Sequence, residues 1–242
     1  MHTETTATED KSSYRWIALA IGALVQAVVA GAAWTIMPVL FYEISRPVPV
    51  GLGLSLVELG AIWGMFPLAV AFFCIPMGMA ADRYGVRLIV GIGVLVAAAG
   101  GALRGTSSGF APLLASMFLF GAGYSTIGPN LPKMVGMWFG SKELGLASGI
   151  ILGSYGLGAG LAITFGGSYL SPALGGWRNT LYVLGALSLV IGILWIVAAS
   201  LVVSSAIGLM MAFRLEPAKG RVMLLVAAGV MLPLLLFLLA HE

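Results

Sequence analysis

The composition of this 242-residue chain excludes a soluble globular protein. Only 9% of its residues are charged and 60% are hydrophobic, whereas soluble proteins carry about 25% charged residues. The mean hydropathy of +1.05 is spread along the chain and not confined to one segment, so a disordered chain is excluded as well. The composition therefore indicates a polytopic membrane protein.

Charge and cysteine content give no sign of a nucleic-acid, disulfide or metal site. The net charge is +3, but the 12 Lys and Arg residues are scattered and form no basic patch. Cys74 is the single cysteine and lies in an apolar run, where it is interpreted as a packing residue. Because GxSxG, HExxH and Walker motifs are absent as well, we expect no enzyme activity, no cofactor, no metal and no nucleic-acid partner.

Seven stretches without charged residues predict the membrane spans. A helix needs about 20 residues to cross the hydrocarbon core. The third stretch has only 16 residues, so Arg87 and Arg104 are expected at its ends, with their side chains extended toward the headgroups. The β-barrel alternation of apolar and polar residues is absent, which leaves helices. The stretches are residues 16–42, 59–81, 88–103, 105–132, 144–177, 179–213 and 222–240.

The sixth stretch is longer than one span requires. Its 35 uncharged residues would form a helix of roughly 52 Å, so the helix either continues beyond the membrane or breaks, with Ser204, Ser205 and Gly208 as the expected break. Seven spans and a cytoplasmic N-terminus place nine of the 12 Lys and Arg residues inside and three outside. Splitting the sixth stretch would give six and six. The positive-inside rule therefore favours seven spans.

The link between the second and third spans carries the most informative motif, Gly-x-x-x-Asp-Arg-x-Gly-x-Arg, which begins at Gly78. Gly78 would let another helix approach closely, Gly85 would permit a tight reversal, and Asp82 would accept hydrogen bonds from the positive end of a neighbouring helix. Arg83 and Arg87 would hold the loop at the inner headgroups. A simple positive-inside turn with a chance acidic residue stays open as the alternative.

This motif resembles the loop signature of the major facilitator superfamily, whose secondary transporters consist of two six-helix halves. Residues 138–149 are similar to that family's link between helices four and five, and residues 176–179 are similar to the start of its helix six. The resemblance covers residues 16–203, which is one six-helix half. It implies a 3+3 repeat of helices in this part of the chain.

The chain also departs from the family's pattern. Val86 stands where a basic residue is common, and Met117 stands where proton-coupled antiporters carry an arginine on helix four. Residues 149–160 lack the Gly-Pro pair of many drug exporters, and no carboxylate lies deep in a span. These departures disfavour proton-driven drug export.

The predicted fold is an all-α polytopic membrane bundle. We expect a cytoplasmic polar tail at residues 1–15, a six-helix bundle at 16–203, a cytoplasmic connector at 204–220 and an additional transmembrane helix at 221–242. No second copy of the loop motif follows, so the sequence predicts half a transporter that forms a homodimer or pairs with a second six-helix half.

Glycines recur every four residues on the fifth span. Residues at this spacing share one helix face, so the stripe offers bare backbone for close packing. In the resembled family, helices two and five contact the opposite half, which makes the stripe a candidate docking surface; packing within this bundle is the open alternative. The stripe consists of Gly145, Gly149, Gly153, Gly156 and Gly160, and Gly60 and Gly64 repeat the spacing on the second span.

The resemblance implies a solute site lined by helices one, two, four and five. Deep polar residues on these helices are Gln26, Tyr124, Ser125, Thr126, Asn130, Ser154 and Tyr155. Lys133 would either attract an anion into a cavity or reach the inner headgroups. Each of the polar residues is also open to interpretation as a helix-packing hydrogen bond. The predicted substrate-binding set is Gln26, Tyr124, Asn130, Lys133 and Tyr155.

These features predict a half-size secondary transporter for a small solute in the plasma or inner membrane. A small anion is preferred because carboxylates are absent from the spans. The alternative is a transport-incompetent, truncated or partner-binding subunit, suggested by the unmatched tail at residues 214–242. A seven-helix receptor or retinal protein fits the helix number, but the cytoplasmic N-terminus and a seventh helix without lysine argue against it.

Overall fold

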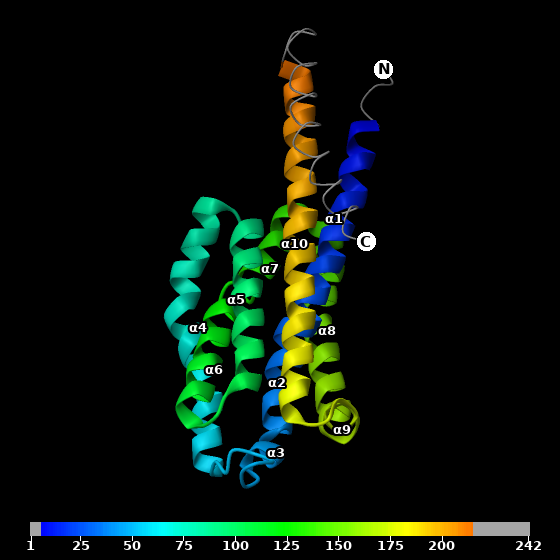
Figure 1. Ribbon diagram of the computed structural model, residues 1–242. Helices are drawn as coiled ribbons and strands as arrows, with labels where there is room; N and C mark the ends of the chain where they lie inside the picture. The colour runs from blue at the N-terminus through cyan, green and yellow to red at the C-terminus, as the bar shows by residue number, and fades with distance from the viewer. Residues whose placement is uncertain (1–5, 215–242) are drawn as a thin grey trace, which may run out of the picture. The chain divides into compact units, whose positions relative to one another are not determined.

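The computed structural model describes residues 6–214, with side chains described for residues 15–198 (Figure 1). Every regular element in this part of the chain is a helix, which confirms the predicted all-α class. The chain divides into two compact units, Met1–Ile196 and Val197–Glu242. The helical bundle discussed below belongs to the first unit. The predicted additional helix at residues 221–242 lies outside the described residues.

The first span is a helix with a widened middle. It consists of α1 (Thr6–Val25), the π-helical segment η1 (Gln26–Ala32) and α2 (Ala33–Val39), followed by the short helix α3 (Phe41–Ser45). Pro38 lies inside α2 and removes one backbone donor from the helix. The irregular hydrogen bonding therefore lies in the second half of the span.

The second and third spans form a helical hairpin. Helix α4 (Leu56–Tyr84) begins with a capping box between Ser55 and Glu58 and ends at Gly85. Gly85 has a φ of 92°, which a glycine adopts without strain. The chain reverses there directly into α5 (Val86–Thr106). The tight reversal predicted for Gly85 is therefore confirmed.

The fourth span is broken in the middle. It comprises α6 (Phe110–Tyr124) and α7 (Asn130–Trp138), separated by a turn at residues 125–129. Pro129 lacks a backbone N–H, and its ring would collide with the carbonyl of Ser125 in a continuous helix. The uncharged stretch 105–132 had suggested one uninterrupted segment, whereas the structure divides it at Gly128-Pro129.

The fifth and sixth spans complete the bundle. Helix α8 (Ser141–Phe165) continues through the π-helical segment η2 (Gly166–Leu170) and the short helix α9 (Ser171–Leu174). Helix α10 (Trp177–Arg214) follows after Gly175 and Gly176, both with positive φ. The predicted break at residues 204–208 is absent, because the helix is continuous to Arg214.

Five of these segments are long and apolar enough to cross a membrane: Arg15–Val39, Leu56–Tyr84, Val86–Thr106, Ser141–Leu174 and Trp177–Ala198. The fourth span adds a shorter apolar helix, Phe110–Tyr124, which ends at the break in that span. These positions agree with the first six predicted spans. The chain is therefore an integral membrane protein.

Close helix packing in the bundle depends on buried glycines. A Cβ atom at Gly158 of α8 would collide with the backbone of Ala27 in η1, and one at Gly123 of α6 would collide with the backbone of Ala97 in α5. Figure 1 shows the same arrangement, with α5 beside α6 and α8 beside the first span. Bare backbone at these crossings lets the helices approach closely.

Candidate functional site

The α4–α5 turn, named the gating loop here (residues 78–87), is linked by charge to the second half of the fourth span. Lys133 of α7 forms an ion pair with Asp82, whose side chain is 65% exposed. The guanidinium of Arg87 lies 4.5 Å from the centroid of the Trp138 ring, also on α7. Asp82 therefore binds a lysine side chain, where the sequence had suggested the positive end of a neighbouring helix.

A second ion pair closes the same end of the bundle. Arg15 in α1 binds Glu143 at the start of α8 through Nη1 and Nη2 of its guanidinium, at 2.8 and 2.9 Å. Its guanidinium also lies 5.3 Å from the Phe139 ring, and Trp16 packs edge-on against that ring. Figure 1 shows the start of α1 and the α4–α5 turn at one end of the bundle. The four segments α1, α4–α5, α7 and α8 are thus bridged pairwise at this end.

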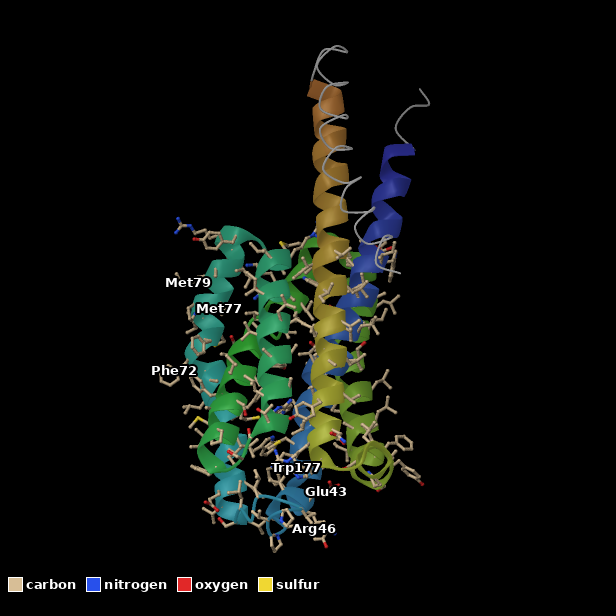
Figure 2. All side chains as sticks on the ribbon, in the orientation of Figure 1. Glu43, Arg46, Phe72, Met77, Met79 and Trp177 are labelled. Carbon is tan, nitrogen blue, oxygen red and sulfur yellow. The ribbon has the colours of Figure 1, made fainter. Side chains whose placement is uncertain are left out.

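The opposite end is held by side-chain hydrogen bonds. Glu43 accepts a hydrogen bond from Ser171 at 2.7 Å, and the indole of Trp177 donates to the Val50 carbonyl at 3.2 Å. Figure 2 shows Glu43, Arg46 and Trp177 at this end. Arg46 lies over the Tyr42 ring and donates to its hydroxyl, which lowers the pKa of Tyr42.

Between the two ends, aromatic side chains from four spans form a cluster. Trp34 of α2 stacks on Trp63 and Phe66 of α4, with ring centroids 5.8 and 4.8 Å apart. Phe66 in turn contacts Tyr124 of α6 at 4.9 Å, and Trp34 lies 6.4 Å from Tyr155 of α8. The aromatic cluster, defined as Trp34, Trp63, Phe66, Phe120, Tyr124 and Tyr155, therefore unites the helices on which the solute site was predicted.

The cluster has an accessible front and a buried back. Trp63 is 37% exposed, and Trp34, Tyr124 and Tyr155 are partly exposed. Phe66 and Phe120 are buried, with their ring centroids 5.8 Å apart. Tyrosine and tryptophan combine an apolar ring with a polar group, so the front can bind a solute that has both apolar and hydroxyl surfaces.

Gln26 is buried at the start of η1, and its side-chain oxygen has no hydrogen-bond partner among the described residues. The indole nitrogen of Trp34 is likewise buried and without a partner there. A buried amide and indole without partners are costly. Both groups lie on the first span.

Asn130, by contrast, is occupied within its own span. It is buried and donates to the Thr126 carbonyl at 2.7 Å, across the break in the fourth span. Ser125 and Thr126 donate to carbonyls at the end of α6, and Ser154 donates to the Ile150 carbonyl. All four bonds stay within the residue's own span, so none of them is the bond between helices that the sequence left open as the alternative.

The five predicted substrate-binding residues therefore do not form one group. Tyr124 and Tyr155 belong to the aromatic cluster, and Gln26 lies buried on the first span. Asn130 spans the helix break, and Lys133 is paired with Asp82 in the gating loop. The structure also places Trp34, Trp63 and Phe66 in the aromatic cluster with Tyr124 and Tyr155, and the sequence had not indicated these three residues.

Arg104 is the largest departure from the sequence prediction. It lies in the last turn of α5, as expected, but its side chain does not extend to the headgroups and is 0% exposed. Its Nη2 donates to the Ala33 carbonyl at 2.9 Å, and its guanidinium lies 4.3 Å from the Phe120 ring. The glycines around it explain the burial: Gly100 and Gly105 let neighbouring helices approach the backbone of α5.

The glycine stripe of α8 faces away from the bundle. A Cβ atom built at Gly145, Gly149, Gly153, Gly156 or Gly160 would meet no other atom within 4 Å. The same holds for Gly60, Gly64 and Gly78 of α4. The alternative of packing inside this bundle is therefore wrong for the described residues, and the close approach expected at Gly78 involves none of them.

Large apolar side chains accompany the glycines on these outward faces. Phe72 and Met79 of α4 are each 67% exposed, and Figure 2 shows them pointing away from the bundle. On α8, Leu152, Leu157 and Leu161 are exposed between the glycines. The outward faces of α4 and α8 are thus apolar and open to a lipid or a protein partner.

The sequence profile of the Major Facilitator Superfamily matches residues 19–240. The chain belongs to this family. Over 150 residues it is 29% identical to a probable L-galactonate transporter of Escherichia coli (strain K12), covering 60% of this chain and 31% of that protein. It is also 26% identical over 150 residues to a hexuronate transporter of Bacillus subtilis (strain 168), covering 60% of this chain and 34% of that protein. The chain therefore spans about a third of the length of these curated relatives.

Family membership confirms the resemblance drawn from the gating loop. The loop residues Gly78, Asp82, Arg83, Gly85 and Arg87 lie within the matched region and join two spans. Arg83 lies 5.4 Å from the Tyr84 ring and is exposed. The role of these residues in gating stays a prediction.

Proposed function

We propose that this chain forms one six-helix half of a secondary transporter for sugar acids, which moves its solute by alternating access after pairing with a second half. The observation that carries the proposal is the aromatic cluster, which joins the first, second, fourth and fifth spans and has a partly exposed front. Family membership supports the mode of transport.

The chemistry of the cluster supports a sugar acid as the solute. A sugar acid combines C–H surfaces, hydroxyl groups and one carboxylate. Trp34 and Trp63 offer ring faces for the C–H surfaces, and the hydroxyls of Tyr124 and Tyr155 offer hydrogen bonds. The two relatives, named as transporters of L-galactonate and of hexuronate, support the same class of solute.

The outward faces of α4 and α8 support the pairing with a second half. Both faces combine bare glycine backbone with exposed apolar side chains. Close helix packing in membranes relies on such small residues. A second copy of this chain or a separate six-helix half would cover both faces and would enclose the front of the aromatic cluster.

The gating loop supports alternating access. The ion pairs Asp82–Lys133 and Arg15–Glu143 lie at one end of the bundle, the end that the positive-inside rule places in the cytoplasm. Pairs at a partly exposed end are weak enough to exchange during opening. The chain is proposed to lie in the plasma or inner membrane with this end inside.

Transport is tested by reconstituting the full 242-residue chain into liposomes and measuring uptake of labelled D-galacturonate. The proposal predicts saturable uptake, with competition by unlabelled galactonate and none by an amino acid such as leucine. Chemical cross-linking in the same vesicles should report a dimer or a complex with a second half. A chain that stays monomeric and takes up no sugar acid above empty liposomes would contradict the proposal.

A further inference from the structure

Arg104 carries a positive charge inside the bundle without a counter-ion. Its guanidinium is fully buried in the last turn of α5, and it forms no ion pair with any residue between 15 and 198, the range of described side chains. Placing a charge inside a membrane span is costly unless it is paired. A residue kept at this cost inside a span indicates a function beyond packing.

The contacts of Arg104 only partly compensate its charge. Nη2 donates to the Ala33 carbonyl, Nη1 lies 3.9 Å from the sulfur of Met117, and the guanidinium faces the Phe120 ring. Its Nε is buried and has no hydrogen-bond partner among the described residues. A carbonyl, a thioether and a ring face are neutral groups, so the positive charge is solvated but not cancelled.

The position of Arg104 connects this charge to the aromatic cluster. Phe120 contacts Arg104 on one side and Phe66 on the other. Phe66 stacks against Trp34, and Ala33, whose carbonyl Arg104 binds, is the residue before Trp34. The charge therefore lies one aromatic layer behind the front of the cluster.

We propose that Arg104 is the specificity-determining residue that makes the aromatic cluster select anionic solutes. It acts through the low-dielectric layer formed by Phe120 and Phe66, and does not touch the solute. Opposite charges about 10 Å apart at an effective dielectric of about 20 attract strongly enough for roughly a tenfold gain in affinity. This inference rests on the proposed function, because it explains how the site would distinguish a sugar acid from a neutral sugar.

The test compares binding of D-galacturonate with binding of D-galactose, which replaces the carboxylate by a neutral hydroxymethyl group. The full chain is purified in lipid nanodiscs, and both affinities are measured by thermal stabilisation. We expect the wild-type chain to prefer galacturonate by about tenfold. Arg104→Gln should reduce this preference to about onefold by weakening galacturonate binding alone, and Arg104→Lys should keep most of it.

A second variant addresses the case in which Arg104→Gln does not fold. Met117→Glu places a carboxylate next to Nη1, so Arg104 keeps a partner and its charge is cancelled within the bundle. We expect this variant to lose the preference as Arg104→Gln does. Arg178→Gln is the matched control, because Arg178 also donates to backbone carbonyls, those of Gly105 and Ser107, but makes no contact with the aromatic cluster. It should keep the wild-type preference.

The outcomes separate this inference from the proposed function. A wild-type chain that binds neither solute would contradict the proposed function. A wild-type chain that binds both solutes equally would contradict the role of Arg104 without contradicting the proposed transport function. Folded Arg104→Gln and Met117→Glu variants that keep the tenfold preference would do the same. Loss of the preference in Arg178→Gln as well would reduce Arg104 to a structural residue.

Discussion

The charged residues of this protein differ in whether they are exposed and paired or buried without a counter-ion among the described residues. Asp82 and Lys133 are partly exposed and meet at one end of the bundle, as paired charges usually do. Arg104 is positively charged like Lys133, but its side chain is fully buried. The glycines of α5 allow the neighbouring helices to approach closely and enclose it. The sequence alone predicted that the Arg104 side chain would extend to the headgroups and left the same role open for Lys133, because charge and position along a span do not reveal what packs around a residue.

The ion pair between Asp82 and Lys133 can be tested by exchanging the charges. Asp82→Asn and Lys133→Gln should each lower galacturonate uptake, while the free energy of unfolding changes by only about 0.2–1 kcal/mol, since the pair is partly exposed. The double variant Asp82→Lys with Lys133→Asp should recover uptake toward the wild-type rate. An exchange that stays as slow as the single variants would show that the pair does not gate transport.

Irregular helices concentrate where the aromatic cluster lies. The first span contains the π-helical η1, and the fourth span breaks between α6 and α7. The break could have been predicted, because Gly128 and Pro129 adjoin and both disfavour helix. The π-helical segment carries no comparable signal in the sequence, and neither does the contact between the backbone of its Ala27 and Gly158 of a distant helix.

The hydrogen bond across the break in the fourth span should stabilise the bundle. Asn130→Ala would leave the Thr126 carbonyl buried without that donor, which should cost about 1–2 kcal/mol of unfolding free energy. Asn179→Ala is the control, because Asn179 makes a similar bond to the Leu174 carbonyl at an exposed position. Unfolding in mixed micelles should show the larger loss for Asn130. Equal losses would mean that burial of this bond has no effect.

The two kinds of glycine on α8 should respond oppositely to alanine. Gly158→Ala introduces a Cβ into the backbone of η1 and should destabilise the bundle by about 1–3 kcal/mol. Gly156→Ala meets no atom within 4 Å and should be neutral or stabilising by up to about 1 kcal/mol, because alanine favours helix over glycine. Unfolding measurements on both variants check this. Similar losses would contradict the assignment of inner and outer faces.

At the scale of the whole molecule, the sequence predicted the fold class and the membrane spans well. Runs of uncharged residues locate the spans because every span must cross the same hydrocarbon core and therefore needs an apolar segment of similar length. The sequence could not predict contacts between distant segments. Arg15 and Glu143 are 128 positions apart, and the periodicity of apolar residues does not indicate such a pair. The aromatic cluster was missed for a related reason, since Trp34, Trp63 and Phe66 resemble ordinary apolar residues until the spans are placed side by side.

The exposed glycine faces predict how pairing would fail. Gly153→Leu should leave the six-helix bundle folded, because no atom lies within 4 Å of its added Cβ. The larger side chain should nevertheless prevent close docking of a second half, so uptake and cross-linking should fall together. Leu157→Ala on the same face keeps the surface small and should preserve both. Cross-linking that is unchanged in Gly153→Leu would place the partner elsewhere.

The most direct test of the central claim asks whether the front of the aromatic cluster faces a solute pathway. Trp63→Cys is made together with Cys74→Ala, which removes the single native cysteine. The account predicts that a membrane-impermeant thiol reagent labels Cys at this position in reconstituted protein, and that D-galacturonate slows the labelling. Labelling by lipid-soluble reagents alone, unaffected by any sugar acid, would contradict a solute pathway along this face.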